Sequence, residues 1–258
     1  MIDFHIYPLG DWGVRPILFY IGNTPVPSYT FFIALAFIVG LLVYFLEAKK
    51  SKSLGESNIY IIFGALIGGA IGAKLLDFVI EYRYFLENSP GLDAIFFGKT
   101  IVGGLIGGLV GVKIAKKIFK INEKKGNLFA PAIAIGVAIG RLGCFFRGCC
   151  YGKATFLPWG VNFGDGILRH PTQIYESIFM FAMFIYLESR KKDSKPGQLF
   201  KILMLYYFIF RFFIEFIRVG SIFMFGLTAF QIISLFVIIY LVKDDLIKLL
   251  LKSKNYVK

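Results

Sequence analysis

The chain has 258 residues, 57% of them hydrophobic, and a mean hydropathy of +0.70. These values exclude an ordinary soluble globular domain and an intrinsically disordered chain. The formal net charge is +13, from 29 Lys and Arg against 16 Asp and Glu. In so apolar a chain we assign this charge to loops that lie against anionic lipid, and we expect no nucleic-acid partner.

Seven apolar runs approach the length of about 20 helical residues that crossing a bilayer requires. They lie at residues 29–46, 59–79, 100–115, 128–146, 172–187, 199–217 and 227–242. The segment before them is mixed in composition, as in an interfacial segment. The sequence therefore predicts an all-α integral membrane protein with seven transmembrane helices, in one polytopic domain over residues 1–258.

Basic residues fall on alternate loops between these runs, which predicts the orientation of the chain. They gather at residues 49–52, 116–125, 190–195 and in the tail at 243–258. Because Lys and Arg mark cytoplasmic loops, we expect the N-terminus outside and the C-terminus, with its basic tail, in the cytoplasm. The segment at residues 147–170 then lies on the extracytoplasmic side of a plasma membrane.

Small residues recur at a spacing of four in three runs. The sets are Gly64, Gly68 and Gly72; Gly103, Gly107 and Gly111; and Ala132, Gly136 and Gly140. This spacing lets helix backbones approach closely in a membrane. Helix packing explains most of these glycines, and only Gly103 and Gly104 are candidates for a functional site.

Of the charged residues inside the apolar runs we single out three, because an isolated charge there costs about 2.5–3.5 kcal/mol. Arg141 is near the end of the fourth run, and Arg211 and Glu215 are four residues apart in the sixth. Two interpretations stay open: ion pairs that order the bundle, or guanidiniums that grip a lipid phosphate bidentately. Intramembrane ionisable groups favour the functional interpretation.

The polar segment between the fourth and fifth runs holds the other candidates. His170 is either a helix-entry group or a proton acceptor, with Glu176 and Tyr29 as further possible acceptors. Three cysteines, Cys144, Cys149 and Cys150, offer three ligands and no fourth, so we expect small buried side chains rather than a metal site. A thiol function at Cys149 remains an alternative. We expect no cofactor.

Several motifs occur in order along nearly the whole chain. They are Gly140-Arg-Leu-Gly-Cys-Phe with Gly152, Pro158-Trp-Gly, Arg169-His-Pro-Thr-Gln-Ile-Tyr-Glu176, the block at residues 210–218, and Gly226-Leu-Thr with Gln231 and Ser234. In these motifs the chain resembles the prolipoprotein diacylglyceryl transferase family. The resemblance implies a bacterial inner-membrane enzyme that moves the diacylglyceryl group of phosphatidylglycerol to the lipobox cysteine of a prolipoprotein signal peptide.

The resemblance also implies site residues. Arg141, Gly152, Arg211 and Glu215 match family site positions, as do the glycine pair and Tyr29. Val102 stands where the family usually has His, and Cys144 and Cys149 stand where it usually has Asn and Glu. With no histidine at position 102, we assign the role of proton acceptor to His170.

The expected site has two groups of residues. The catalytic candidates are Arg141, Arg211, Glu215 and His170. The substrate-binding candidates are Tyr29, Gly103, Gly104, Cys144, Cys149, Gly152 and Gln173. Two alternatives to the transferase remain: a protein of this fold that acts on another lipid or acceptor, and a lipid-binding protein without catalysis. A small transporter is disfavoured, because no inverted repeat with broken helices is visible.

Overall fold

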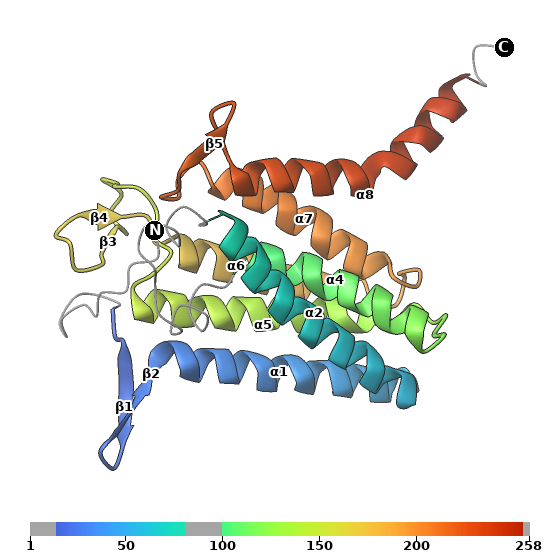
Figure 1. Cartoon of the computed structure of the whole chain (residues 1–258), viewed down its shortest axis with the longest axis horizontal. Helices are drawn as coiled ribbons and strands as arrows, with labels where there is room; N and C mark the ends of the chain where they lie inside the picture. Colours follow the sequence, from blue (N-terminus) through green and yellow to red (C-terminus); the bar gives the residue numbers. More distant parts are fainter. Residues whose placement is uncertain (1–13, 81–99, 255–258) are drawn as a thin grey trace. The chain divides into compact units, whose positions relative to one another are not determined.

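The computed structural model describes residues 14–80 and 100–254, with side chains for residues 14–80 and 100–243 (Figure 1). Over these residues the chain is mostly helical. The helices are α1 Ser28–Lys50, α2 Glu56–Ile80, α4 Ile101–Ile118, α5 Gly126–Arg147, α6 Thr172–Ser189, α7 Gln198–Ile214 and α8 Ala229–Lys254. Each predicted apolar run therefore contains a helix. The sixth run extends three residues past its helix, because α7 ends at Ile214.

In the described part of the chain, three two-stranded antiparallel hairpins, which the hydropathy pattern did not predict, lie before α1, between α5 and α6, and between α7 and α8. They pair β1 Ile17–Ile21 with β2 Thr24–Pro27, β3 Val161–Asn162 with β4 Leu168–Arg169, and β5 Ile222–Met224 with β6 Leu227–Thr228. The last hairpin turns through Gly226, whose φ of +74° is a backbone conformation that glycine adopts without strain. The seventh predicted run thus begins in a strand rather than in a helix.

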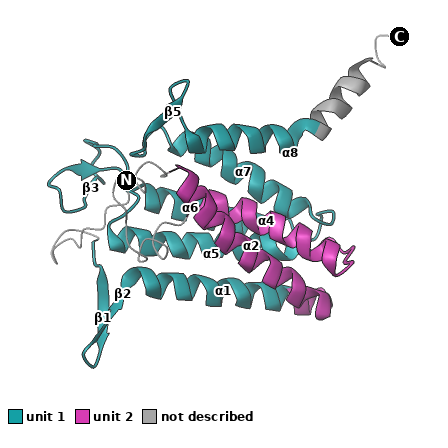
Figure 2. Cartoon of the chain, in the orientation of Figure 1, with its two compact units in different colours: residues 1–47, 125–258 teal, residues 48–124 magenta. Residues whose placement is uncertain are grey.

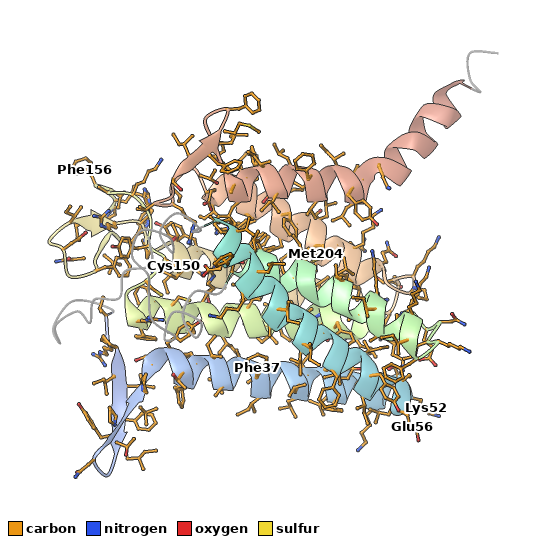
Figure 3. The ribbon with its side chains drawn as sticks, viewed as in Figure 1. Phe37, Lys52, Glu56, Cys150, Phe156 and Met204 are labelled. Carbon is orange, nitrogen blue, oxygen red and sulfur yellow. The ribbon has the colours of Figure 1, made fainter. Side chains whose placement is uncertain are left out.

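Three of the described helices are long and apolar enough to cross a membrane, judged by length and composition: α1, α2 and α5. The part of α8 at Ala229–Lys243 is a shorter apolar helix. Many large apolar side chains on these helices are exposed; Phe37 on α1 is one of them (Figure 3). Such exposed surface is expected of a membrane protein, whose solvent is lipid.

The chain forms two compact units (Figure 2). The second unit, residues 48–124, is built from α2 and α4, which meet through their glycines. A Cβ atom at Gly64 would lie 2.8 Å from the carbonyl oxygen of Gly111, and one at Gly107 would lie 2.7 Å from the Cα of Gly72. Real side chains do not fit at such distances, so the predicted close packing of these glycines is confirmed.

The first unit, residues 1–47 and 125–258, holds the other helices around α5. On one side α5 meets α1, where a Cβ at Gly143 would lie 2.9 Å from the Cβ of Phe32. On another side it meets α6, where Ser177 donates a 2.8 Å hydrogen bond to the carbonyl of Ala138. Further packing joins α5 to α7 and α7 to α8. Helix α5 is therefore the element on which the first unit is assembled.

The segment after α5 folds back onto the end of that helix. Phe145 from α5 packs in a buried cluster with Val14, Val161 and Phe163, and the ring of Tyr151 stacks on Phe163 with centroids 5.0 Å apart. This small core fixes the segment between α5 and α6, which carries the polar motifs of the sequence, against the helix that carries Arg141.

Candidate functional site

A buried carboxylate joins three helices at the centre of the site. Nη2 of Arg141, on α5, lies 2.7 Å from Oε2 of Glu176, on α6. The hydroxyl of Tyr207, on α7, donates a 3.1 Å hydrogen bond to Oε1 of the same carboxylate. Glu176 and Tyr207 are fully buried. The charge of Arg141 is thus compensated by a partner on a neighbouring helix.

The second buried arginine has its partner at the end of its own helix. Nη2 of Arg211 lies 2.8 Å from Oε2 of Glu215, which caps α7. Nε of Arg218 lies 3.6 Å from the same oxygen, and Nη1 of Arg218 donates a 3.0 Å hydrogen bond to the carbonyl of Cys150. The guanidinium of Arg211 also faces the ring of Phe230 on α8, 4.8 Å from its centroid.

Both buried arginines keep donors that no described group uses. Nε of Arg141, and Nε and Nη1 of Arg211, are buried without a hydrogen-bond partner among the described residues. A buried donor without a partner costs about 1–3 kcal/mol, and more when it is charged. Unused N–H groups on two buried cations are suited to an anion such as a phosphate.

The two arginines belong to one electrostatic network. Arg211 is within electrostatic range of Glu176, the partner of Arg141, and of Tyr207, which donates to Glu176. Tyr207 also lies one helical turn before Arg211 on α7. The structure therefore places Arg141 in one electrostatic network with Arg211 and Glu215, the pair whose spacing of four was already visible in the sequence.

Gly152 is fixed by main-chain contacts on both sides. Its N–H donates a 2.8 Å hydrogen bond to the carbonyl of His170, and it forms an isolated bridge with Arg218. A Cβ atom here would lie 2.6 Å from the carbonyl oxygen of Ile217 and 2.7 Å from the Cβ of His170. Only glycine fits, because this is where the segment after α5 and the segment after α7 meet.

His170 is held by its main chain and by its ring. Its N–H donates a 3.0 Å hydrogen bond to the carbonyl of Lys153, and its Nδ1 lies 3.3 Å from the hydroxyl of Tyr175. That hydroxyl accepts a 2.8 Å hydrogen bond from Nε1 of Trp159. The contact with Tyr175 orients a half-buried imidazole, which suits a proton acceptor as well as a helix-entry group.

The three cysteines converge at the end of α5. The chain adopts left-handed backbone conformations at Gly148 (φ +78°) and at Cys150 (φ +65°). These two turns direct Cys149 and Cys150 back towards Cys144, so that the three Sγ atoms all lie within 4.8 Å of one another. Hydrogen bonds from the other two thiols, assisted by Arg218 and Arg141, lower the pKa of Cys150.

Side chains from α6 hold the turn at residues 148–150, here called the cysteine turn, in place. Gln173 donates a 2.5 Å hydrogen bond from Nε2 to the carbonyl of Cys149, and Thr172 donates a 2.8 Å hydrogen bond to the carbonyl of Cys150. Both side chains are fully buried. In the structure, Gln173 thus stabilises the cysteine turn; its expected role in substrate binding stays a prediction.

Tyr29 lies at the same end of the first unit. A Cβ at Gly143 would come within 3.4 Å of the Cα of Tyr29, and the guanidinium of Arg147 faces the Tyr29 ring at 5.2 Å. The three cysteines are all within electrostatic range of its hydroxyl. Tyr29 is therefore near the cysteine turn, and its binding role stays a prediction.

Gly103 and Gly104 lie in the second unit and differ in their packing. The N–H of Gly103 donates a 3.1 Å hydrogen bond to Oγ1 of Thr100, and a Cβ at Gly103 would lie 2.8 Å from the Cβ of Leu76. At Gly104 the nearest atoms would be 3.8 Å away. Helix packing explains why residue 103 is a glycine. At position 104 an added Cβ atom would meet no close contact, so packing does not explain that glycine.

A sequence profile of the family described as prolipoprotein diacylglyceryl transferase matches residues 16–243. The chain belongs to the prolipoprotein diacylglyceryl transferase family. A Clostridium tetani protein named phosphatidylglycerol–prolipoprotein diacylglyceryl transferase is 35% identical over 244 residues, 88% of this chain and 94% of that protein. Proteins of the same name from Finegoldia magna (33% identical, 86% of this chain and 91% of that protein) and Clostridioides difficile (35%, 80% and 84%) are also similar.

Two residues of this diacylglyceryl transferase family member were not singled out by sequence reasoning. In the sequence, Tyr207 is one of several aromatic residues in an apolar run. In the structure, its buried hydroxyl donates a hydrogen bond to Glu176. In the sequence, Arg218 is a basic residue at the end of an apolar run. In the structure, it pairs with Glu215 and donates a hydrogen bond to the carbonyl of Cys150 in the cysteine turn. The available signal was the helical spacing of Tyr207, Arg211 and Glu215, which places all three on one face of α7.

Proposed function

We propose that this chain is a phosphatidylglycerol–prolipoprotein diacylglyceryl transferase, which moves the diacylglyceryl group to the lipobox cysteine thiol of prolipoproteins. Family membership and the names of relatives that cover most of the chain support this function. The structural observation that carries it is the pair of buried arginines, Arg141 and Arg211, with N–H donors left unused.

The reaction needs an anion site at the phosphate of the donor lipid. The acceptor sulfur attacks the glyceryl carbon, an S–C bond forms, the C–O bond to phosphate breaks, and glycerol phosphate leaves. Arg141 and Arg211 bind the phosphate and stabilise the charge that develops on the leaving group. Glu176 and Glu215 each hold one Nη2 atom, which orients the remaining donors.

The acceptor thiol must also lose its proton. His170 is the proton acceptor in this proposal, oriented by Tyr175. Substrate-binding roles are assigned to the remaining candidates around the site and in the second unit. They are Tyr29, Gly103, Gly104, Cys144, Cys149, Gly152 and Gln173.

The topology follows from the charge pattern. The seven described helices each cross the plasma membrane of a bacterium, with the N-terminus outside and the tail at residues 243–258 in the cytoplasm. The segment at residues 147–170 lies on the extracytoplasmic side, where phosphatidylglycerol and the signal peptide meet it. The alternation of basic loops supports this orientation, and the apolar helices support the membrane location.

A reconstituted reaction tests the function. Purified chain in phosphatidylglycerol vesicles is mixed with a lipobox peptide, and the peptide is analysed by mass spectrometry. A diacylglyceryl adduct is expected on the peptide with cysteine and not on a matched peptide with serine. Vesicles of phosphatidylethanolamine alone test the donor. A chain that binds phosphatidylglycerol but forms no adduct would support a lipid-binding protein without catalysis.

A further inference from the structure

The three thiols form a cluster of ligand atoms to which the proposed transfer assigns no chemical step. Cys144 comes from the last turn of α5, and Cys149 and Cys150 follow the end of that helix. All three are free cysteines, and their Sγ atoms lie within 4.8 Å of one another. These are the only cysteines of the chain. Their convergence therefore concentrates every thiol of the protein at one point.

The backbone is strained in the conformation that makes the thiols converge. Cys150 has a φ of +65°, which a residue with a side chain rarely adopts and which costs roughly 1–3 kcal/mol. The surrounding structure maintains it: Thr172 and Arg218 both donate to the Cys150 carbonyl, and Gln173 donates to the Cys149 carbonyl. The turn is thus held from α6 and from the segment after α7, independently of the thiols.

The spacing of the sulfurs is close to that of a metal-thiolate centre. With Zn–S bonds of about 2.3 Å, ligand sulfurs in a tetrahedral centre lie about 3.8 Å apart. The present upper limit of 4.8 Å means that the sulfurs need to approach by at most about 1 Å. Side-chain rotation in a preformed turn supplies that movement.

The three sulfur ligands and the positive charges near them favour a soft divalent cation that keeps one coordination position free for another ligand. Among the described residues, no fourth ligand atom from a histidine, cysteine or acidic side chain joins the three sulfurs. Three thiolates on a divalent cation carry a net charge of −1, and the guanidiniums of Arg141 and Arg218 are both within electrostatic range of Cys150. Three protein ligands with a fourth position for water or substrate are typical of catalytic zinc.

We propose that Cys144, Cys149 and Cys150 bind Zn²⁺ as a three-thiolate site, whose fourth position takes the acceptor thiol. The role of the fourth position rests on the transfer function proposed above. Binding of the metal releases the protons of the three thiols to solvent. The acceptor thiol passes its own proton to His170 as it coordinates, because a metal-bound thiol is deprotonated. Its sulfur subsequently attacks the glyceryl carbon, as in the reaction above.

Metal content tests the site without reference to activity. The full chain, purified without a histidine tag, is loaded with Zn²⁺ and freed of excess metal, and zinc is then measured by mass spectrometry. One Zn²⁺ per chain is expected, with affinity at least about tenfold lower in each of Cys144→Ser, Cys149→Ser and Cys150→Ser. His170→Gln is the matched control and should keep its zinc. Wild-type protein without stoichiometric zinc would overturn the proposal.

Two measurements on the wild-type chain keep the test valid if a serine variant fails to fold. Co²⁺ in place of Zn²⁺ should give the near-ultraviolet sulfur-to-metal absorption band, and Zn²⁺ should slow alkylation of all three thiols until a chelator is added. A Co²⁺ complex without that band would overturn the site. A stable disulfide among these cysteines, detected as a loss of two hydrogens from the mass, would overturn it as well.

Transfer assays then separate this proposal from the function on which it rests. With the metal site intact, stripping Zn²⁺ should lower the transfer rate by about 10²-fold, the lower range for a lost general base, and adding Zn²⁺ should restore it. Bound zinc with a rate that is unchanged by stripping would overturn the role of the fourth position. Normal transfer by a chain that binds no zinc would overturn the metal site alone. Bound zinc without any transfer would overturn the proposed function and leave the metal site standing.

Discussion

Nη2 of Arg141 lies 2.7 Å from Oε2 of Glu176, and the two side chains are only 7% and 0% exposed. This contact explains how a charge is tolerated inside an apolar helix, since the partner comes from the neighbouring helix α6. It also fixes the guanidinium through a single nitrogen. Nε of Arg141 is left without a partner among the described residues, so it remains free to bind an anion.

Replacing Glu176 by Leu should strongly destabilise the first unit. The change leaves the buried charge of Arg141 uncompensated and removes the acceptor of the Tyr207 hydrogen bond. Breaking a buried ion pair costs roughly 3–5 kcal/mol in the free energy of unfolding. The measurement is thermal unfolding of the purified chain in detergent.

Glu188 provides the matched control for that variant. It also lies on α6, but its side chain is 31% exposed and pairs with Lys191. Glu188→Leu should lower the free energy of unfolding by at most about 1 kcal/mol. Equal losses in the two variants would mean that the buried pair has no special structural role.

The helices could be predicted from the sequence, whereas the contacts that build the site could not. Hydropathy placed the seven helices of the described residues, because an apolar run of sufficient length has few alternatives in a membrane. The Arg211–Glu215 pair was also predictable, since a spacing of four on a helix brings side chains together. Local spacing carries no information about Arg141 and Glu176, whose side chains meet only when α5 packs on α6.

The cysteine cluster escaped prediction for a different reason. The sequence shows three cysteines without a fourth ligand, and their convergence depends on left-handed turns at Gly148 and Cys150. A left-handed residue is predictable at glycine but not at cysteine. The hairpins were missed as well, because strands of two to five residues are too short to show a period in hydropathy.

Two glycines of α4 should respond differently to the addition of one methyl group. In Gly107→Ala the new Cβ would lie 2.7 Å from the Cα of Gly72, so α2 and α4 must separate. Overpacking of this kind costs about 1–3 kcal/mol. Gly104→Ala should fold normally, because its Cβ meets nothing closer than 3.8 Å.

The comparison of these variants is made by thermal unfolding and by transfer rate. A folded Gly104→Ala chain with reduced transfer would support substrate binding at Gly104. A Gly107→Ala chain as stable as wild type would contradict the tight contact of these two helices.

The proposed topology predicts which positions an impermeant thiol reagent reaches from outside the cell. Single cysteines are introduced at Ser51, Asp193 or Phe156 after the native cysteines are removed. Phe156, in the segment after α5, is fully exposed (Figure 3), and Phe156→Cys should be labelled in intact cells. Ser51→Cys and Asp193→Cys should be labelled only after the membrane is opened. Labelling with the reverse pattern would invert the orientation.

His170→Gln should slow transfer while leaving the fold intact, because the main-chain bonds of residue 170 do not depend on the ring. The loss should shrink as pH rises, since an acceptor thiol with a pKa near about 8.5 then ionises without a base. The measurement is the transfer rate from pH 6 to 9, about the range in which that thiol titrates.

Tyr175→Phe is the control for this prediction. It removes the hydroxyl that contacts the ring of His170 but keeps the imidazole, so its effect on the rate should be smaller than that of His170→Gln. A loss in His170→Gln that does not change with pH would instead indicate a structural role for His170.

The most direct measurement of the central claim is the transfer rate of Arg141→Lys and Arg211→Lys beside wild type, with phosphatidylglycerol and a lipobox peptide. Lysine keeps the positive charge but loses the planar fork that the unused Nε and Nη1 donors provide. The matched control is Arg169→Lys, in a pair with Asp165 whose side chains are 19% and 31% exposed. We expect an adduct with wild type and with the control, and rates at least about tenfold lower in the two buried variants, because each loses a charged hydrogen bond. Full rates in both buried variants, or no adduct with wild type, would contradict it.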